Sequence, residues 1–233
     1  MSEPLPTVLI PGLLCSPRLY RGQITPLWQF GPVMIADHTR DDSMSAIARR
    51  ILAFAPPRFA LVGLSMGGYI SFEILRQAPE RVAKLALLDT TARPDTPEQT
   101  ERRRAQVALA KTGRLLEVVD TLFPMIVHRE HRNDESLRAI AHAMAEEVGP
   151  AAFERQQTAI IGRPDSRPDL AAIRCPTLVL VGEGDELTPP ERAAEMANGI
   201  AGSRLVTIPD AGHSSTLEQP HLVAKSLVEF LQP

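Results

Sequence analysis

Short apolar runs alternate along this chain with segments whose apolar residues recur at helical spacing. Most of the runs are apolar throughout, as in parallel strands that helices cover on both faces. The runs occupy residues 7–10, 32–36, 58–64, 82–88, 177–181 and 203–208. Helical patterns occupy residues 43–54, 67–78, 189–199 and 218–231. This alternation predicts an α/β fold with a mostly parallel six-stranded sheet flanked by helices.

The alternation stops between Asp89 and Cys175, where no strand-like run occurs from about residue 96 to residue 162. Amphipathic helical sequence fills this interval, and prolines bracket it at positions 94, 97, 164 and 168. We therefore expect a helical lid (cap) over residues 95–168, inserted into a core formed by residues 1–94 and 169–233. Ligands of open α/β sheets bind at the carboxyl ends of the strands, so the lid should cover that edge.

Composition narrows the function classes further. With 44% hydrophobic and 23% charged residues, the 233-residue chain has the balance of a globular protein. The net charge of −3 offers no electrostatic footprint for nucleic acid or an anionic membrane surface, so neither is expected as a partner. The one basic run, Arg102, Arg103 and Arg104, is expected on a solvated helix face. The sequence leaves the oligomeric state open.

The N-terminal residues lack the positive charge and long apolar stretch of a signal peptide, and no apolar run is long enough for a membrane span. A cytoplasmic protein is therefore expected. Two cysteines, Cys15 and Cys175, are too few for a disulfide framework, and we expect both as reduced thiols.

The sharpest local signal is G-x-S-x-G-G, formed by Gly63, Ser65, Gly67 and Gly68 between a strand run and a helix pattern. Such a turn forces the central residue into a strained backbone and needs small neighbours. It holds the serine hydroxyl at a helix N-terminus, where negative charge is stabilised. We therefore interpret Ser65 as a candidate nucleophile.

A serine nucleophile needs a base and an orienting acid. Asp185 follows one strand run and His213 follows the next, which places both at the carboxyl edge. The chain order Ser65, Asp185, His213 is that of the α/β-hydrolases. Glu183 and Asp89 remain alternative acids.

The other histidines give weaker signals. His128, His131 and His142 lie in the helical interval, where surface histidines are a better interpretation than a metal site. His38 and His221 have no partner in view.

An oxyanion hole would complete the site. One donor should be the N–H of Met66, the residue after the candidate nucleophile, and the second should come from the loop after the first strand. There Gly12 permits a sharp turn, which makes the Leu13 N–H the expected second donor.

With these residues placed, residues 5–231 resemble the α/β-hydrolase superfamily. Three stretches are similar to its 3-oxoadipate enol-lactonase and carboxylesterase branch: GLSMGG, CPTLVLVGEGDELTPP and IPDAGHSSTLEQPHLV. The stretch RVAKLALLDTTARPDTPE is also similar to that branch. Two departures stand out. Pro11-Gly12 replaces the family's usual His-Gly, and the usual N-terminal hairpin is missing, which implies a trimmed six-stranded sheet.

The resemblance implies a carboxylic ester hydrolase that cleaves a small ester, lactone or thioester through an acyl-enzyme, with no metal or organic cofactor. Leu122, Phe123, Met125 and Met144 are candidates for the pocket wall or for plain lid core. A C–C bond hydrolase or a cofactor-free perhydrolase would use the same triad. A non-enzymatic ligand-binding or signalling protein on the same fold also remains open. A dehalogenase would need aspartate at position 65, so that class is disfavoured.

Overall fold

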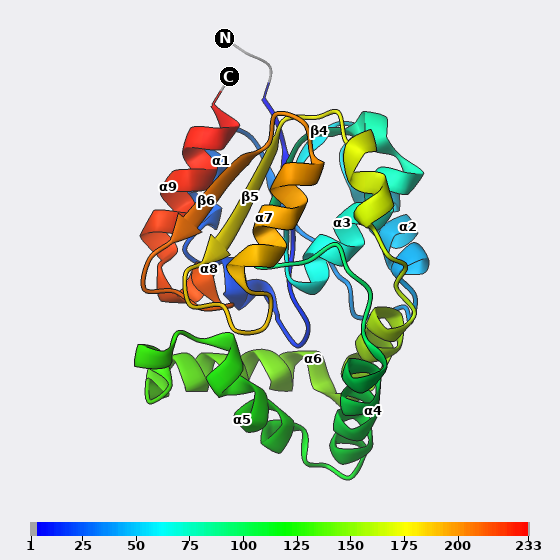
Figure 1. Ribbon diagram of the computed structural model, residues 1–233, viewed down its shortest axis with the longest axis vertical. Helices are drawn as coiled ribbons and strands as arrows, with labels where there is room; N and C mark the ends of the chain where they lie inside the picture. The colour runs from blue at the N-terminus through cyan, green and yellow to red at the C-terminus, as the bar shows by residue number, and fades with distance from the viewer. Residues whose placement is uncertain (1–3, 233) are drawn as a thin grey trace.

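The computed structural model describes residues 4–232 and has a six-stranded sheet at its centre (Figure 1). Every neighbouring pair is parallel, in the order β2-β1-β3-β4-β5-β6. The strands are β1 (Thr7–Ile10), β2 (Val33–Ile35), β3 (Phe59–Leu64), β4 (Val82–Leu88), β5 (Thr177–Gly182) and β6 (Arg204–Ile208). The predicted fold class is thereby confirmed, and all six strands end within two residues of their predicted limits.

Helices cover both faces of the sheet. Successive strand residues point to opposite faces, so each strand contributes to two apolar layers. Leu61, Leu85 and Val179 pack in one apolar layer with α2 (Met44–Phe54), α3 (Met66–Gln77) and α7 (Pro190–Gly199). Val62 and Leu180 pack in the other layer with α1 (Ile24–Trp28) and α9 (Pro220–Leu231). The apolar runs of the strands are thus explained by burial on both faces.

Some short elements were not predicted. A 3-10 turn, Pro17–Tyr20, and the five-residue α1 follow β1, and neither is long enough to show a helical repeat. The predicted helix 218–231 corresponds to α9, which begins at Pro220, and a separate short helix, α8 (Ser215–Glu218), precedes it. Proline fits this position because its missing N–H would have no helical acceptor there.

The interval without strands contains α4 (Pro97–Lys111), α5 (Leu115–Ile126) and α6 (Glu135–Ile161), together with the 3-10 turn Arg129–His131. These helices lie together beyond the sheet in Figure 1, at the end where the strands finish. At Gly149 the backbone of α6 leaves helical geometry, with φ of 77°, just before Pro150. The proposed division into a 95–168 lid and a two-part core remains a prediction.

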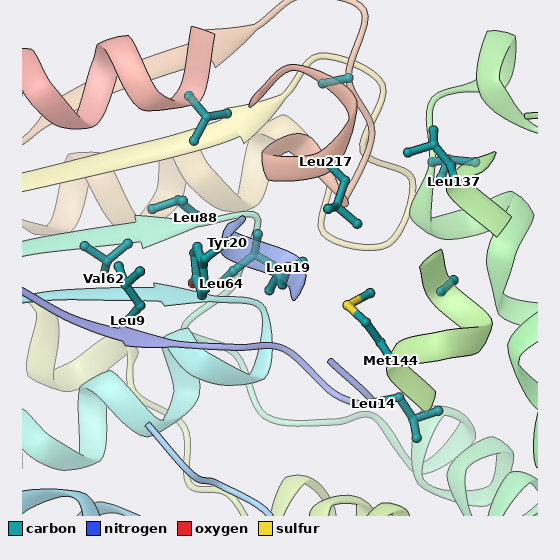
Figure 2. Close-up of a cluster of buried hydrophobic side chains, with 14 of the residues drawn as sticks. Leu9, Leu14, Leu19, Tyr20, Val62, Leu64, Leu88, Leu137, Met144 and Leu217 are labelled. Atoms are coloured by element: carbon teal, nitrogen blue, oxygen red, sulfur yellow. The ribbon is translucent and has the colours of Figure 1, made fainter. Parts of the chain in front are cut away.

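One apolar layer continues from the sheet into these helices (Figure 2). Leu64 and Leu88 at the strand ends belong to the same buried cluster as Phe123 of α5 and Met144 of α6. The helices therefore pack on the sheet edge through a shared core, and Phe123, 1% exposed, belongs to that core.

The structure bears on the expectations for the basic run, the two cysteines and membrane spans. Arg103 was expected on a solvated face, but its side chain is only 19% exposed because it pairs with Asp95 of the preceding loop. Cys15 and Cys175 are free thiols. Within residues 4–232, no helix is both long and apolar enough to cross a membrane.

Candidate active site

Ser65 forms the turn between β3 and α3, in a backbone conformation that non-glycine residues rarely adopt (φ 54°, ψ −115°). Two hydrogen bonds hold the Ser65 backbone in this conformation. The Ser65 N–H donates to the Leu88 carbonyl at 3.0 Å, and the Ser65 carbonyl accepts from Thr90 Oγ1 at 2.8 Å. The hydroxyl is therefore presented at the N-terminus of α3 by a strained but firmly held backbone.

The glycines around Ser65 are required by close packing. A Cβ atom at Gly63 would collide with the backbone of Gly67, and one at Gly67 would collide with the Ile10 carbonyl. The spacing of glycines in the motif thus follows from how closely α3 approaches β1 and β3.

His213 and Asp185 meet at the same edge of the sheet. Asp185 accepts from His213 Nδ1 at 2.8 Å and from the backbone N–H groups of Leu187 and Thr188 at 2.9 and 2.8 Å. The Thr188 hydroxyl also donates to Asp185 at 2.8 Å. His213 Nε2 is buried and has no hydrogen-bond partner among residues 4–232. With Nδ1–H held by the carboxylate, the neutral ring has its proton acceptor at Nε2.

Electrostatics favour the charged form of this imidazole. Burial acts to lower the pKa of His213, but the neighbouring carboxylates of Asp185, Asp89 and Glu218 outweigh it, and the net pKa is raised. The Asp185 charge acts both through space and through its hydrogen bond.

Neither alternative acid makes a hydrogen bond to His213 within residues 4–232. Glu183 is exposed, so it lacks the buried position of Asp185. Asp89 is fully buried, but it accepts from the Gly182 N–H and the Ser215 hydroxyl. Burial, followed by the Asp185 charge, holds the pKa of Asp89 well above its usual range. Geometry therefore favours Asp185 as the partner of His213.

The loop after β1 approaches Ser65 closely, since a Cβ at Gly12 would lie 3.4 Å from the Ser65 Cβ. Neither candidate oxyanion donor, the Leu13 N–H or the Met66 N–H, has a hydrogen-bond acceptor within the described part of the chain. The next N–H, that of Leu14, donates to the Gln156 side chain of α6 at 3.2 Å. The loop is thus anchored next to two N–H groups that have no acceptor.

His38 takes an unexpected place beside this loop. Its ring is 2% exposed, and Nε2 lies 2.9 Å from the Gly12 carbonyl oxygen, so Nε2 carries the proton and donates. Burial lowers the pKa of His38, which favours the neutral ring. Pro11 stands where the family usually has histidine, and the imidazole that contacts this loop comes instead from His38, in the loop after β2. The sequence showed no sign of this contact.

A cavity of about 620 Å³ lies between the sheet edge and the helices. Ser65, Leu13 and His213 line it from the sheet side. From the helices, three of the four apolar candidates contribute to its wall: Leu122, Met125 and Met144.

Glu218, on α8, was not singled out from the sequence. Its carboxylate is fully buried and accepts from the Gly212 N–H at 2.8 Å, the His128 N–H at 2.6 Å and His131 Nδ1 at 2.8 Å. It therefore ties the loop that carries His213 to the end of α5. His128 is also buried, against expectation, because it packs on Gly184.

Comparison with known proteins agrees with this architecture. Residues 21–220 match the family model for the alpha/beta hydrolase fold. The chain belongs to the α/β-hydrolase family. This confirms the superfamily resemblance and supports a hydrolase.

Three relatives show the range within the α/β-hydrolases. A malate-bound thermophilic esterase from Thermogutta terrifontis is 31% identical, with a TM-score of 0.88 over 97% of this chain and 89% of the esterase. A pimeloyl-acyl-carrier-protein methyl ester esterase of Nitrosomonas europaea is 26% identical over 77% of this chain and 73% of its own length. The enol-lactonase of Burkholderia xenovorans LB400, 23% identical with a TM-score of 0.86 over 99% and 92% of the two chains, shares the fold.

Proposed function

We propose that this α/β-hydrolase cleaves a small ester, lactone or thioester through an acyl-enzyme on Ser65. The observation that carries the proposal is the buried His213, which lines the same cavity as Ser65. Its Nδ1 is held by Asp185, and its Nε2 has no partner within residues 4–232. A base in this state can accept the proton of a serine hydroxyl.

In the proposed reaction, Ser65 Oγ attacks the substrate carbonyl and its proton passes to His213 Nε2. Asp185 stabilises the imidazolium through the Nδ1–H hydrogen bond. As the tetrahedral intermediate collapses, the bond to the leaving group breaks and His213 transfers the proton to that group. Water then attacks the acyl-enzyme by the same route, which releases the acid and restores Ser65.

The developing oxyanion would be bound by the N–H groups of Leu13 and Met66. In a planar trans peptide the C=O and N–H point in opposite directions. The Gly12 carbonyl and the Leu13 N–H belong to one peptide group, so the hydrogen bond from His38 to that carbonyl aims the Leu13 N–H the other way. We assign His38 as a positioning residue for this donor.

The test is labelling with a fluorophosphonate probe, followed by peptide mass spectrometry. We expect an adduct on Ser65 in the wild type and none in Ser65→Ala or His213→Ala. Ser214→Ala is the matched control, because Ser214 also lines the cavity but lies outside the strand–helix turn. It should be labelled like the wild type.

Turnover of simple esters and lactones separates an enzyme from a binding protein. We expect many turnovers per protein molecule, all abolished by Ser65→Ala. A folded wild type that is not labelled, or that releases one equivalent of product and stops, would contradict the proposal.

A further inference from the structure

The cavity beside Ser65 is lined by more positive than negative side chains, although the whole chain carries a net charge of −3. The charged residues in its wall, apart from His213, are five arginines and one glutamate: Arg93, Arg102, Arg103, Arg163, Arg192 and Glu186. A positive concave surface concentrates anionic ligands.

One ion pair neutralises an arginine of the cavity wall, and another neutralises its glutamate. Glu195 pairs with Arg93 at 2.7 Å, and Glu186 pairs with Arg132 at 2.7 Å. Arg102 and Arg192 form no ion pair with any of residues 4–232. The charge balance at the cavity therefore remains positive.

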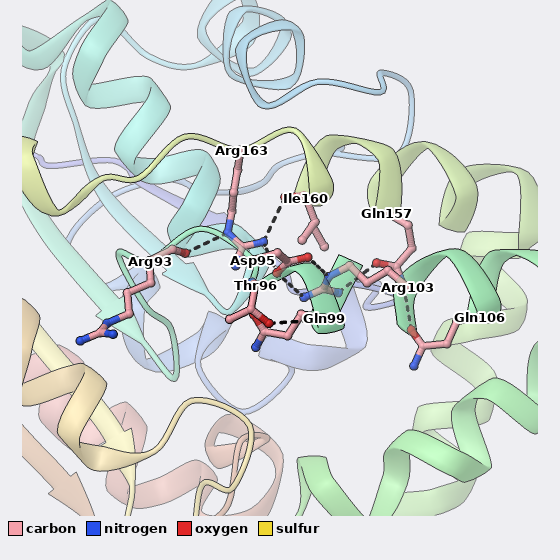
Figure 3. Close-up of polar contacts among 9 residues, drawn as sticks. All are labelled: Arg93, Asp95, Thr96, Gln99, Arg103, Gln106, Gln157, Ile160 and Arg163. Carbon is pink, nitrogen blue, oxygen red and sulfur yellow. Dashed lines mark hydrogen bonds and ion pairs between the residues drawn. The ribbon is translucent and has the colours of Figure 1, made fainter. Parts of the chain in front are cut away.

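Two further arginines share a single carboxylate in a cluster of Asp95, Arg103 and Arg163, here called the Asp95 cluster (Figure 3). Arg103 Nε lies 2.6 Å from Asp95, and Arg163 Nη1 lies 2.7 Å from it. The three side chains are 19%, 5% and 2% exposed for Arg103, Arg163 and Asp95. One buried and one partly buried cation on a single anion leave one positive charge, which solvent screens less than it screens an exposed charge.

Arg163 is the cluster member best placed to bind a ligand. Its Nε donates to the Arg93 carbonyl at 3.1 Å, and its Nη1 is used by Asp95 and by the Ile160 carbonyl. Within residues 4–232, its Nη2 has no hydrogen-bond acceptor, and the residue lines the cavity.

The guanidinium of Arg163 lies over the Tyr69 ring, 4.2 Å from the centroid. Tyr69 also lines the cavity and follows Ser65 by four residues, about one turn of α3. Arg163 thus contacts a residue that lies one helical turn from the candidate nucleophile and lines the same cavity.

We propose that the cavity selects an ester or lactone whose acyl part ends in a carboxylate, bound by Arg163 of the Asp95 cluster. This inference rests on the proposed function. Because His213 protonates the leaving group, the leaving group lies next to His213, and the arginine is assigned to the acyl chain. A guanidinium recognises a carboxylate through charge-assisted, directional hydrogen bonds.

The first experiment compares matched methyl esters on the wild type: monomethyl glutarate against methyl pentanoate, and monomethyl adipate against methyl hexanoate. Each pair has one acyl length and differs in the terminal carboxylate. Kinetics are measured at constant ionic strength. We expect kcat/KM to favour the charged ester at one of these lengths by about tenfold or more, the range for hydrogen bonds to charged groups.

Variants then locate the preference. Arg163→Gln should lower the ratio of charged-ester to neutral-ester kcat/KM by about tenfold, mainly through KM. Arg163→Lys keeps the charge but loses the planar donor geometry, so it should retain part of the ratio. Arg104→Gln is the control, since Arg104 is exposed on the same helix as Arg103 and pairs with Glu101.

A binding measurement keeps this inference separate from the proposed reaction. Glutarate and adipate should bind Ser65→Ala by calorimetry, more tightly than pentanoate or hexanoate, whether or not the protein hydrolyses esters. Equal rates for charged and neutral esters at both lengths, together with no preference for the diacids, would overturn the inference. Loss of ester hydrolysis alone would count only against the proposed function. If Arg163→Gln does not fold, the wild-type comparison still decides.

Discussion

The sheet edge and the helices of residues 97–161 form the same cavity in different ways. At the sheet edge, the candidate catalytic groups are held mainly by backbone and by nearby residues. Asp185, for example, accepts from the N–H groups two and three residues further on. In the helical segment, polar contacts join distant residues: Arg103 reaches Gln157, and Arg163 reaches Asp95.

This difference predicts that the sheet edge controls the chemical step and that the helical segment controls substrate specificity. Ser65 and Asp185 are held by contacts at the sheet edge, whereas the loop of His213 is also tied to the end of α5 through Glu218. The Asp95 cluster forms only when α4, α6 and the loop before α4 pack together. Apart from residues such as Glu218 that join the two regions, mutations in each region should change different kinetic parameters.

The largest expected effect compares the two carboxylates at the sheet edge. Asp185→Asn removes the charge that accepts from His213 Nδ1, so we expect kcat to fall by roughly 10⁴-fold, as in other serine triads. Asp89→Asn should have a much smaller effect, because Asp89 accepts from the Gly182 N–H and the Ser215 hydroxyl and makes no hydrogen bond to His213 among the described residues. Steady-state kinetics on one ester measure both. An equal loss in the two variants would contradict the assignment of Asp185.

The oxyanion loop should show a smaller effect. His38→Ala removes the donor to the Gly12 carbonyl and frees that peptide to rotate, so we expect kcat to fall by about 10- to 100-fold with little change in KM. His38→Gln can donate to the same oxygen and should restore part of kcat. Inhibition by a boronic acid, which mimics the tetrahedral state, should weaken in parallel with kcat. A merely structural role would instead lower the melting temperature and leave boronate affinity per folded molecule unchanged.

Sequence patterns predicted the strands and the candidate site more fully than the cavity, for a physical reason. Uninterrupted apolar runs follow directly from burial on two faces, and the glycines around Ser65 follow from the close approach of backbone segments. The same local rules led to Ser65, Asp185 and His213, whose catalytic roles remain predictions.

Contacts made by the folded chain account for what was missed. Nothing near His38 in the sequence indicates Gly12, which is 26 residues away, and Arg103 in its basic run gives no sign of Asp95 on one side and Gln157 on the other. Glu218 lies within one of the stretches that resemble the family, but two of its three donors, His128 and His131, come from a segment about 90 residues earlier. Short elements such as α1 were missed because five residues cannot show a periodic pattern.

Glu218 connects the two regions, and its removal should reduce stability. Glu218→Gln exchanges charge-assisted hydrogen bonds for neutral ones and leaves buried N–H groups less well paired. We expect a loss of about 1–3 kcal/mol in the free energy of unfolding, measured in urea. Glu147→Gln, which removes an exposed pair with Arg18, is the control and should change stability by less than about 1 kcal/mol. Equal effects would mean that Glu218 does not tie the regions together.

The smallest effect concerns pH. The proposed base must be neutral, so kcat/KM should fall as pH drops through the pKa of His213, which lies above the usual 6.5. The negative charge of Glu218 is one of the groups that raise this pKa, after Asp185 and Asp89. Removing it with Glu218→Gln favours the neutral imidazole, so the acidic limb of the profile should move to lower pH by a fraction of a unit. Glu130→Gln changes an exposed carboxylate and should leave the limb in place. If the acidic limb of the Glu218→Gln profile is unchanged or moves to higher pH, the charge of Glu218 does not act on the group that controls the rate.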